Sequence, residues 1–177
     1  MTTDRNHWKN RLRSLADGSL GPVPERMVFV SPLIEFAPAT RGIYLMGLLP
    51  WLGVDGIGRP LNGESKGRWY KVRPISALQS LTEIISDVRR RLVRGLPLPA
   101  RCRVLVVQGD GDNTVDPAAT QLLATGLIGP TPRLLNVRSW MHNPVGPDGH
   151  QGHRFTPEEA ALRDRLLTAI GDHLAKP

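Results

Sequence analysis

Short apolar runs alternate along the chain with longer stretches in which apolar residues recur at helical spacing. The runs are continuous, as in strands that a parallel sheet buries on both faces. They cover residues 27–30, 103–108 and 133–138. Helical spacing extends over residues 76–95 and again from Pro157 onward. Strands that alternate with helices predict an α/β fold, with a mostly parallel sheet of about three strands and flanking helices.

Two of the expected helices carry recognisable signals at their ends. Ser76 and Gln79 have the spacing of a capping box, and Gly95 is a natural stop for the helix that they begin. Thr156 and Glu159 have the same spacing at the start of the last helix. The apolar stripe of that helix comprises Leu162, Leu166, Ile170 and Leu174. These signals predict where both helices begin.

Two segments lack this regular pattern. Residues 1–24 form a polar amino-terminal segment, and residues 33–74 are irregular and rich in glycine and proline. Because connections of that length are usually functional, residues 33–74 are expected to form a lid-like insertion. Its apolar side chains could line a substrate pocket or cover the core: Leu45, Met46, Leu48, Leu49, Trp51 and Leu52. Residues 1–177 are expected to form a single domain.

Composition excludes some classes of protein. The chain has 177 residues, of which 40% are hydrophobic and 22% charged, as is ordinary for a soluble globular protein. Cys102 is the only cysteine, which excludes an internal disulfide and a zinc site with several thiolates. The longest apolar stretch, residues 43–54, is shorter than the roughly 20 residues that cross a bilayer, and the amino terminus is polar. A cytoplasmic protein is expected.

The net charge of +7 raises the question of nucleic-acid binding. However, the basic residues are spread along the chain, and aromatic residues make up only 5% of it. The one dense basic run, residues 87–95, lies on an expected helix, where such charge usually forms a solvated face. We therefore expect no nucleic-acid partner.

The strand expected at residues 103–108 runs directly into an acidic turn. Oxygen-bearing side chains stand there at alternate positions, as in a calcium-binding loop: Asp110, Asp112, Thr114 and Asp116. However, Val115 stands where such a loop requires glycine, and Gln121 where it requires glutamate. Asp116, followed by Pro117, is instead typical of a helix start. A polar turn that caps a helix is one interpretation of the segment, and a catalytic acid is another.

Position favours a catalytic interpretation of Asp112. In open α/β sheets, functional groups gather at the carboxyl ends of the strands. Asp112 lies four residues past the end of one expected strand, and His142 lies four residues past the end of the next. A carboxylate in that place can accept a hydrogen bond from a histidine and fix its tautomer. The two side chains are therefore expected at the same edge of the sheet.

The segment VLVVQGDGDNTVD (104–116) resembles the acid turn of the α/β-hydrolases, in the branch of serine aminopeptidases and lysophospholipase-like esterases. That turn consists of an apolar strand and then Gly-x-x-Asp-x-x-Val, which Gly109, Asp112 and Val115 match. The run MVFVSP (27–32) is similar to the strand that follows the nucleophile helix in that family. The resemblance extends over about residues 15 to 175.

This resemblance implies a partial α/β-hydrolase fold, the carboxyl-terminal half only, with residues 33–74 as its lid or cap. Asp112 would be the acid that orients the histidine, and His142 would be the general base. Asp110 and Asp116 would be structural. His153 follows the last strand at a less typical distance and is the weaker alternative for the base.

The nucleophile is the missing part of this resemblance. The serine of the family stands in a Gly-x-Ser-x-Gly turn between a buried strand and a helix, before the strand that here begins at Met27. GESKG (63–67) matches the motif around Ser65, but neither a strand nor a helix is expected beside it, so Ser65 is a minor candidate. Ser31 follows a strand, yet Pro32 is incompatible with the sharp turn. The resemblance implies a serine and oxyanion hole from outside this chain.

Histidines near His142 permit a different hypothesis, a zinc site. His142, His150 and His153 lie with Asp148 in one loop, and all four side chains can bind zinc. Their spacing matches no helical ligand pair, and loops rich in glycine and proline are mostly connectors. We expect no metal and no other cofactor.

The leading function is that of a serine hydrolase acting on a carboxylic ester or amide, to which this chain contributes Asp112 and His142. The isolated chain is expected to be inactive. The alternative is a non-catalytic hydrolase remnant or an interaction module. The expected partners are a small-molecule ester or amide, and either a chain that carries the amino-terminal half or a second copy bound through the open sheet edge.

Overall fold

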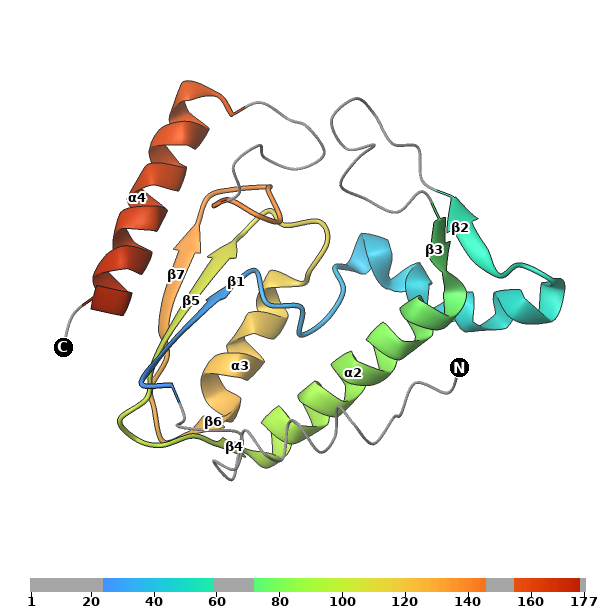
Figure 1. The fold of residues 1–177 in the computed structure, drawn as a ribbon, viewed down its shortest axis with the longest axis horizontal. Coiled ribbons are helices and arrows are strands. Elements are labelled where there is room, and N and C mark those ends of the chain that lie inside the picture. Colours follow the sequence, from blue (N-terminus) through green and yellow to red (C-terminus); the bar gives the residue numbers. More distant parts are fainter. Residues whose placement is uncertain (1–23, 59–71, 146–154, 176–177) are drawn as a thin grey trace.

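The computed structural model describes residues 24–58, 72–145 and 155–175. Its centre is a three-stranded parallel sheet in the order β1-β5-β7 (Figure 1). The strands are β1 (Arg26–Val30), β5 (Arg103–Gly109) and β7 (Arg133–Val137). These are the three strands that the apolar runs predict, and the expected α/β fold class with a mostly parallel sheet is confirmed.

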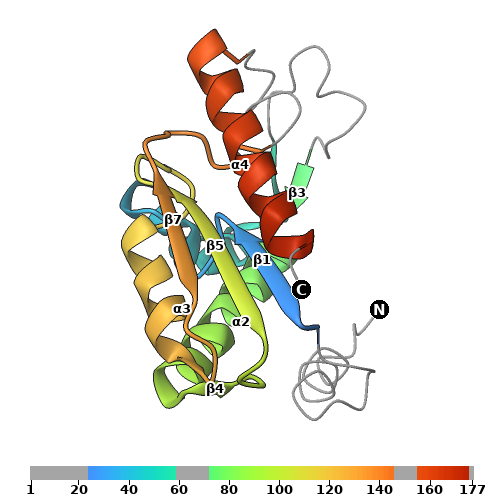
Figure 2. The same ribbon diagram turned by 90° about the vertical axis from the view of Figure 1, so that its left-hand side faces the viewer.

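Helices cover both faces of the sheet (Figure 2). They are α2 (Ile75–Arg94), α3 (Thr120–Gly126) and α4 (Pro157–Ala175). On one face, Val104 and Val106 of β5 share a core cluster with residues of α2 and α3. On the other face, Leu105 and Val107 pack against α4. Because helices lie on both sides, the side chains of β5 from Val104 to Val107 are all buried, which explains its continuous apolar run.

Two further strand pairs lie outside the main sheet. They are the antiparallel pair β2 (Gly56–Gly58) with β3 (Val72–Pro74), and the parallel pair β4 (Leu96–Pro97) with β6 (Leu127–Ile128). The first pair leads into α2, and the second joins the end of α2 to the end of α3. No described helix has both the length and the apolar character needed to cross a membrane.

The start of α2 differs from the expectation. The helix begins at Ile75, with Pro74 as its N-cap residue and no side-chain capping bond, so the capping box predicted from Ser76 and Gln79 is wrong. The physical reason is that Ile75 is itself fixed: its side chain is buried, and its N–H donates to the carbonyl of Asp55. The predicted stop at Gly95 is confirmed, since this residue is the C-cap with a φ of 89°.

The last helix begins as predicted and ends differently. The Thr156 N–H donates to Glu159 Oε2 at 2.8 Å and the Glu159 N–H donates to Thr156 Oγ1 at 3.3 Å, which is a complete capping box. The predicted apolar stripe packs on the sheet as far as Ile170, but Leu174 is 52% exposed. The neighbouring carbonyl of His173 accepts a hydrogen bond from Arg26, the first residue of β1, so the helix has reached the end of the sheet there.

The described part of residues 33–74, which is residues 33–58 and 72–74, is more regular than its composition suggests. It contains η1 (Pro38–Leu52), a 3₁₀ helix of 15 residues that ends at Gly53 with a φ of 74°. Side chains three residues apart are eclipsed in a 3₁₀ helix. Leu45, Leu48 and Trp51 therefore form a row, here called the apolar row, in which each side chain is at least 65% exposed. These three side chains and Leu52 face solvent and do not cover the core, whereas Met46 and Leu49 are partly buried.

Candidate acid–histidine site

Asp112 stands in the turn that follows the central strand. Its side chain has no exposed surface, although the turn lies at the edge of the sheet. Oδ1 accepts hydrogen bonds from the backbone N–H groups of Thr114, at 2.8 Å, and Val115, at 3.1 Å. Oδ2 lies 3.0 Å from Nδ1 of His142. Both carboxylate oxygens are therefore occupied, and the side chain has one orientation available to it.

His142 is brought to Asp112 because the two loops after β5 and β7 press against each other. Asp110 Oδ1 accepts a hydrogen bond from the Ser139 N–H at 3.1 Å, and the Gly111 N–H donates to the Ser139 carbonyl at 3.0 Å. A Cβ on Gly109 would lie only 2.6 Å from that same carbonyl oxygen, so the close approach requires glycine. Asp110 thus joins the loops, in agreement with the structural part expected of it.

The pKa of Asp112 reflects this surrounding. Burial raises the pKa of the carboxyl group, but the hydrogen bonds from His142, Thr114 and Val115 and the nearby imidazole charge together lower it more. The net result is a pKa below the ordinary value of an aspartate. Asp112 is therefore a carboxylate at neutral pH and can balance a positive charge on the imidazole.

The geometry gives the two nitrogens of His142 different tasks. With Nδ1 facing the carboxylate, the neutral imidazole carries its proton on Nδ1, and Nε2 is left as the basic nitrogen. The side chain of His142 is 32% exposed, whereas that of Asp112 is completely buried. The arrangement is suited to accepting a proton at Nε2 and stabilising the imidazolium that results.

Asp116 lies at the far end of the same turn and caps the next helix. Its Oδ1 accepts from the Ala118 N–H at 2.9 Å, at the start of η3 (Pro117–Ala119), which continues into α3. The helix ends at Gly126. Asp112 and Asp116 therefore point to different partners, and within the described residues no group of three or more metal-binding side chains forms.

Ser31 is buried and does not form a nucleophile elbow. Its φ is 44°, its N–H donates to the Val107 carbonyl at 2.8 Å, and its Oγ is sealed from solvent. The chain after Pro32 enters the loop that leads to η1 rather than a helix. Ser65 lies outside the described residues, as do the remaining candidate zinc ligands, Asp148, His150 and His153.

Glu35 is a polar residue that the sequence interpretation missed. It is only 8% exposed, and its carboxylate contacts Tyr44 of η1 and Arg89 of α2. One signal was available: Glu35 is the single charged residue in the apolar stretch SPLIEFAP (31–38). A charged residue that is buried among apolar residues is almost always paired, as Glu35 is.

The chain is similar in fold to a lipolytic enzyme. That solved structure is described as one of "LipS and LipT, two metagenome-derived lipolytic enzymes", and it matches with a TM-score of 0.56 and 16% sequence identity. The match covers 92% of this chain and 60% of that chain, so this chain spans less than two thirds of the length of the similar structure. No family model and no curated protein matches the sequence. At this identity the likeness shows the fold alone.

Proposed function

We propose that this chain supplies the acid and the general base of a serine hydrolase that cleaves carboxylic esters or amides. The observation that supports the proposal is the contact of 3.0 Å between Oδ2 of a fully buried Asp112 and Nδ1 of His142. The solved structure to which this chain is similar is described as a lipolytic enzyme, which is consistent with this chemistry. It is the order and placement of the pair, after neighbouring parallel strands, that favours a Ser-Asp-His triad.

In the proposed reaction, Nε2 of His142 removes the proton from a serine hydroxyl as the oxygen attacks the substrate carbonyl. The imidazolium then donates that proton to the leaving alcohol or amine. Asp112 stays ionised throughout, holds the imidazole in the tautomer with the proton on Nδ1, and stabilises the imidazolium. A water molecule cleaves the acyl-enzyme by the same proton transfers in reverse order.

The serine and the oxyanion hole are proposed to come from residues other than those the structure describes. Ser31 is unsuitable because its Oγ is buried and no helix follows it. In a parallel sheet the natural source is a strand beside β1, since β1 pairs with β5 on one side only among the described strands. Such a strand would belong to a preceding part of a longer chain or to a partner chain that carries the amino-terminal half.

The test begins with the coding DNA upstream of Met1, translated in the three forward frames. A strand-like run that ends in Gly-x-Ser-x-Gly would supply the nucleophile, and the joined protein should hydrolyse p-nitrophenyl butyrate. His142→Ala and Asp112→Asn should then lower kcat/KM by about 10³-fold or more. Asp164→Asn, at an exposed carboxylate of α4, serves as the control. Full activity in His142→Ala would contradict the proposal.

The chain alone provides a second readout. Purified 177-residue protein is expected to show no labelling by a fluorophosphonate serine probe, because it lacks an activated serine. Labelling that disappears in Ser65→Ala would make Ser65 the nucleophile, and the requirement for a second part of the protein would be wrong.

A non-catalytic interaction module is the alternative function, and the apolar row favours it. Leu45, Leu48 and Trp51 are exposed by 70%, 65% and 89%, and a contiguous exposed apolar surface is typical of a binding site. The two functions differ in one measurement: a module would leave the joined protein inactive toward every ester while still binding a partner.

A further inference from the structure

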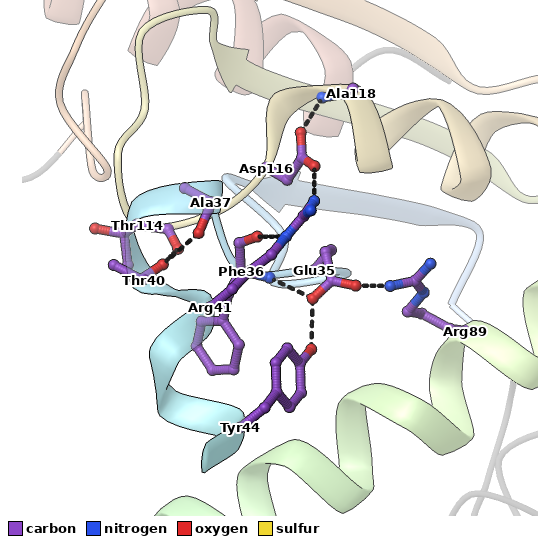
Figure 3. Close-up of polar contacts among 10 residues, drawn as sticks. All are labelled: Glu35, Phe36, Ala37, Thr40, Arg41, Tyr44, Arg89, Thr114, Asp116 and Ala118. Atoms are coloured by element: carbon purple, nitrogen blue, oxygen red, sulfur yellow. Dashed lines mark hydrogen bonds and ion pairs between the residues drawn. The ribbon is translucent and has the colours of Figure 1, made fainter. Parts of the chain in front are cut away.

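Polar side chains that the acid–histidine pair does not use gather where the chain leaves β1 and enters η1 (Figure 3). At the centre is the buried carboxylate of Glu35. Its Oε1 accepts from the Phe36 N–H at 2.9 Å and from the Tyr44 hydroxyl, and its Oε2 pairs with Arg89. A buried carboxylate without such partners would be strongly destabilising, so Glu35 fixes the start of residues 35–41, here called the clamp segment.

The clamp segment lies antiparallel against the acid turn. Phe36 forms an isolated β-bridge with Val115. The Asp116 N–H donates to the Glu35 carbonyl at 2.9 Å, and the Ala37 N–H donates to the Thr114 carbonyl at 3.1 Å. These are contacts of main chain with main chain, so they fix the position of the turn independently of side-chain rotamers.

The clamp segment holds residues 114–116, and two of these, Thr114 and Val115, also hold Asp112. The N–H groups of Thr114 and Val115 donate to Asp112 Oδ1, while Thr114 and Val115 are fixed on their other side by the clamp segment. A displacement of the clamp segment therefore moves the donors that orient the carboxylate. His142 is hydrogen-bonded to this turn through Asp112, so it would respond through Asp112.

Arg41 joins the first turn of η1 to both parts of this arrangement (Figure 3). Its Nε donates to the Phe36 carbonyl at 3.3 Å, and its Nη2 lies 2.9 Å from Asp116 Oδ2. Thr40 adds a second link, since its hydroxyl lies 3.2 Å from the Thr114 carbonyl. Arg41 is half exposed, so a substitution there can loosen the link without opening the core.

We propose that Arg41 and Glu35 are positioning residues, which make the orientation of Asp112 depend on the placement of η1. The inference rests on the proposed function, because the orientation of Asp112 affects catalysis only if the pair is catalytic. A substrate that contacts the apolar row and shifts η1 would thereby change how firmly the acid holds the histidine.

The test compares Arg41→Met with the native chain by NMR on the full 177-residue protein. Three readouts follow the link in order: hydrogen exchange at the Thr114 and Val115 amides, the carboxyl titration of Asp112, and the downfield Nδ1 proton of His142. We expect amide exchange to rise roughly fivefold, as for the loss of one exposed ion pair of about 1 kcal/mol. The pKa of Asp112 should rise, because donors that lower it are held less firmly.

Arg163→Met is the matched control. Arg163 also uses Nε and Nη2 to bind a carboxylate, that of Asp164 on α4, far from the acid turn along the chain. Arg163→Met should leave all three readouts unchanged. Arg41→Lys should bring the readouts part of the way back to the native values, because the ammonium can reach Asp116 but cannot also bind the Phe36 carbonyl.

Two results would overturn the proposal. One is that Arg41→Met and Glu35→Gln both fold and both match the native chain in amide exchange, in the titration of Asp112 and in the Nδ1 proton signal of His142. The other is an identical response in Arg163→Met. Asp112→Ala separates this outcome from failure of the proposed function, because alanine has no oxygen to accept from Nδ1. If the Nδ1 signal survives in Asp112→Ala, the acid–histidine pair itself is absent in solution.

Discussion

Asp112 shows how a single side chain combines burial with a fixed charge. The carboxylate is removed from solvent, yet two backbone amides and an imidazole bind its two oxygens. The residue pattern Gly-x-x-Asp-x-x-Val makes this possible, since the aspartate is followed closely by the amides that it accepts from. The pairing of Asp112 with His142 could be expected from their positions in the chain. The partners of Glu35 could not be predicted, because only tertiary packing brings Tyr44 and Arg89 to it.

The lowered pKa of Asp112 predicts how stability depends on pH. The folded state favours the carboxylate form of Asp112. The contribution of Asp112 to the free energy of unfolding is therefore complete above the pKa of the unfolded state, about 3.9, and is lost as the pH falls through the lower pKa of the folded state. Asp112→Asn should lower the free energy of unfolding at pH 7 by about 1.5–3 kcal/mol, as for hydrogen bonds to a charged group. Urea unfolding from pH 2 to pH 7 measures this.

The same experiment should show a weaker loss of stability below about pH 4 in Asp112→Asn than in the native chain, because the substituted side chain has no charge to lose. Asp164→Asn changes an exposed carboxylate and should follow the native curve closely. Parallel curves for Asp112→Asn and the native chain would mean that Asp112 is not held as a carboxylate in the folded state.

At the scale of elements, local sequence signals predicted the start of one helix, and tertiary packing determined the start of another. The start of α4 followed its capping box. The tertiary hydrogen bond there, from Trp140 Nε1 to Glu159 at 3.3 Å, uses Oε1, whereas the capping bond uses Oε2. The start of α2 followed the burial of Ile75 instead. The 3₁₀ geometry of η1 was not predicted, since its residues show no helical period and long 3₁₀ helices are uncommon.

The contact between α2 and α3 depends on a glycine. A Cβ on Gly126 would lie 2.5 Å from the Leu92 carbonyl oxygen, which is main chain and cannot rotate away. Gly126→Ala is expected to destabilise the protein by about 1–3 kcal/mol through overpacking. Gly171→Ala, inside α4 and with open space around the new methyl group, should stabilise it by about 0.5–1 kcal/mol. Urea midpoints for the two variants would refute this explanation if they shifted equally.

For the whole molecule, the apolar runs were sufficient to predict three parallel strands, the helices between them and the edge at which the acid and the histidine meet. The apolar run of β5 is continuous because both faces of this strand are covered, and the order of residues in the sequence alone reveals it. The fold of residues 33–58, which include the clamp segment, could not be predicted. Their contacts join Phe36 to Val115 and Glu35 to Arg89, pairs that are distant in sequence and follow no period.

The free edge of β1 predicts association. The Ser31 N–H donates to Val107 and the Glu25 carbonyl accepts from Arg103, so by strand alternation the N–H of Val28 points away from β5. Among the described strands, none pairs with that edge. An apolar edge strand of this kind pairs with other chains, and the purified protein should show a mass in light scattering that rises with concentration.

Val28→Pro removes the outward N–H without removing a bond to β5 and should shift the protein toward the monomer. Val28→Ala keeps that N–H and should still associate. A monomeric native protein over the whole concentration range would show that the edge is covered in solution.

The distance along the chain between β1 and β5 has a consequence for synthesis. β1 leaves the ribosome first, but Arg26 to Val30 bond to residues from Arg103 onward. At roughly 5–20 residues per second, several seconds pass before that partner is made. A strand translated earlier in the same polypeptide would already be present to pair with the free edge of β1 during this interval. A separately translated partner would have to reach the nascent chain within it, in competition with neighbouring ribosomes that expose the same sequence.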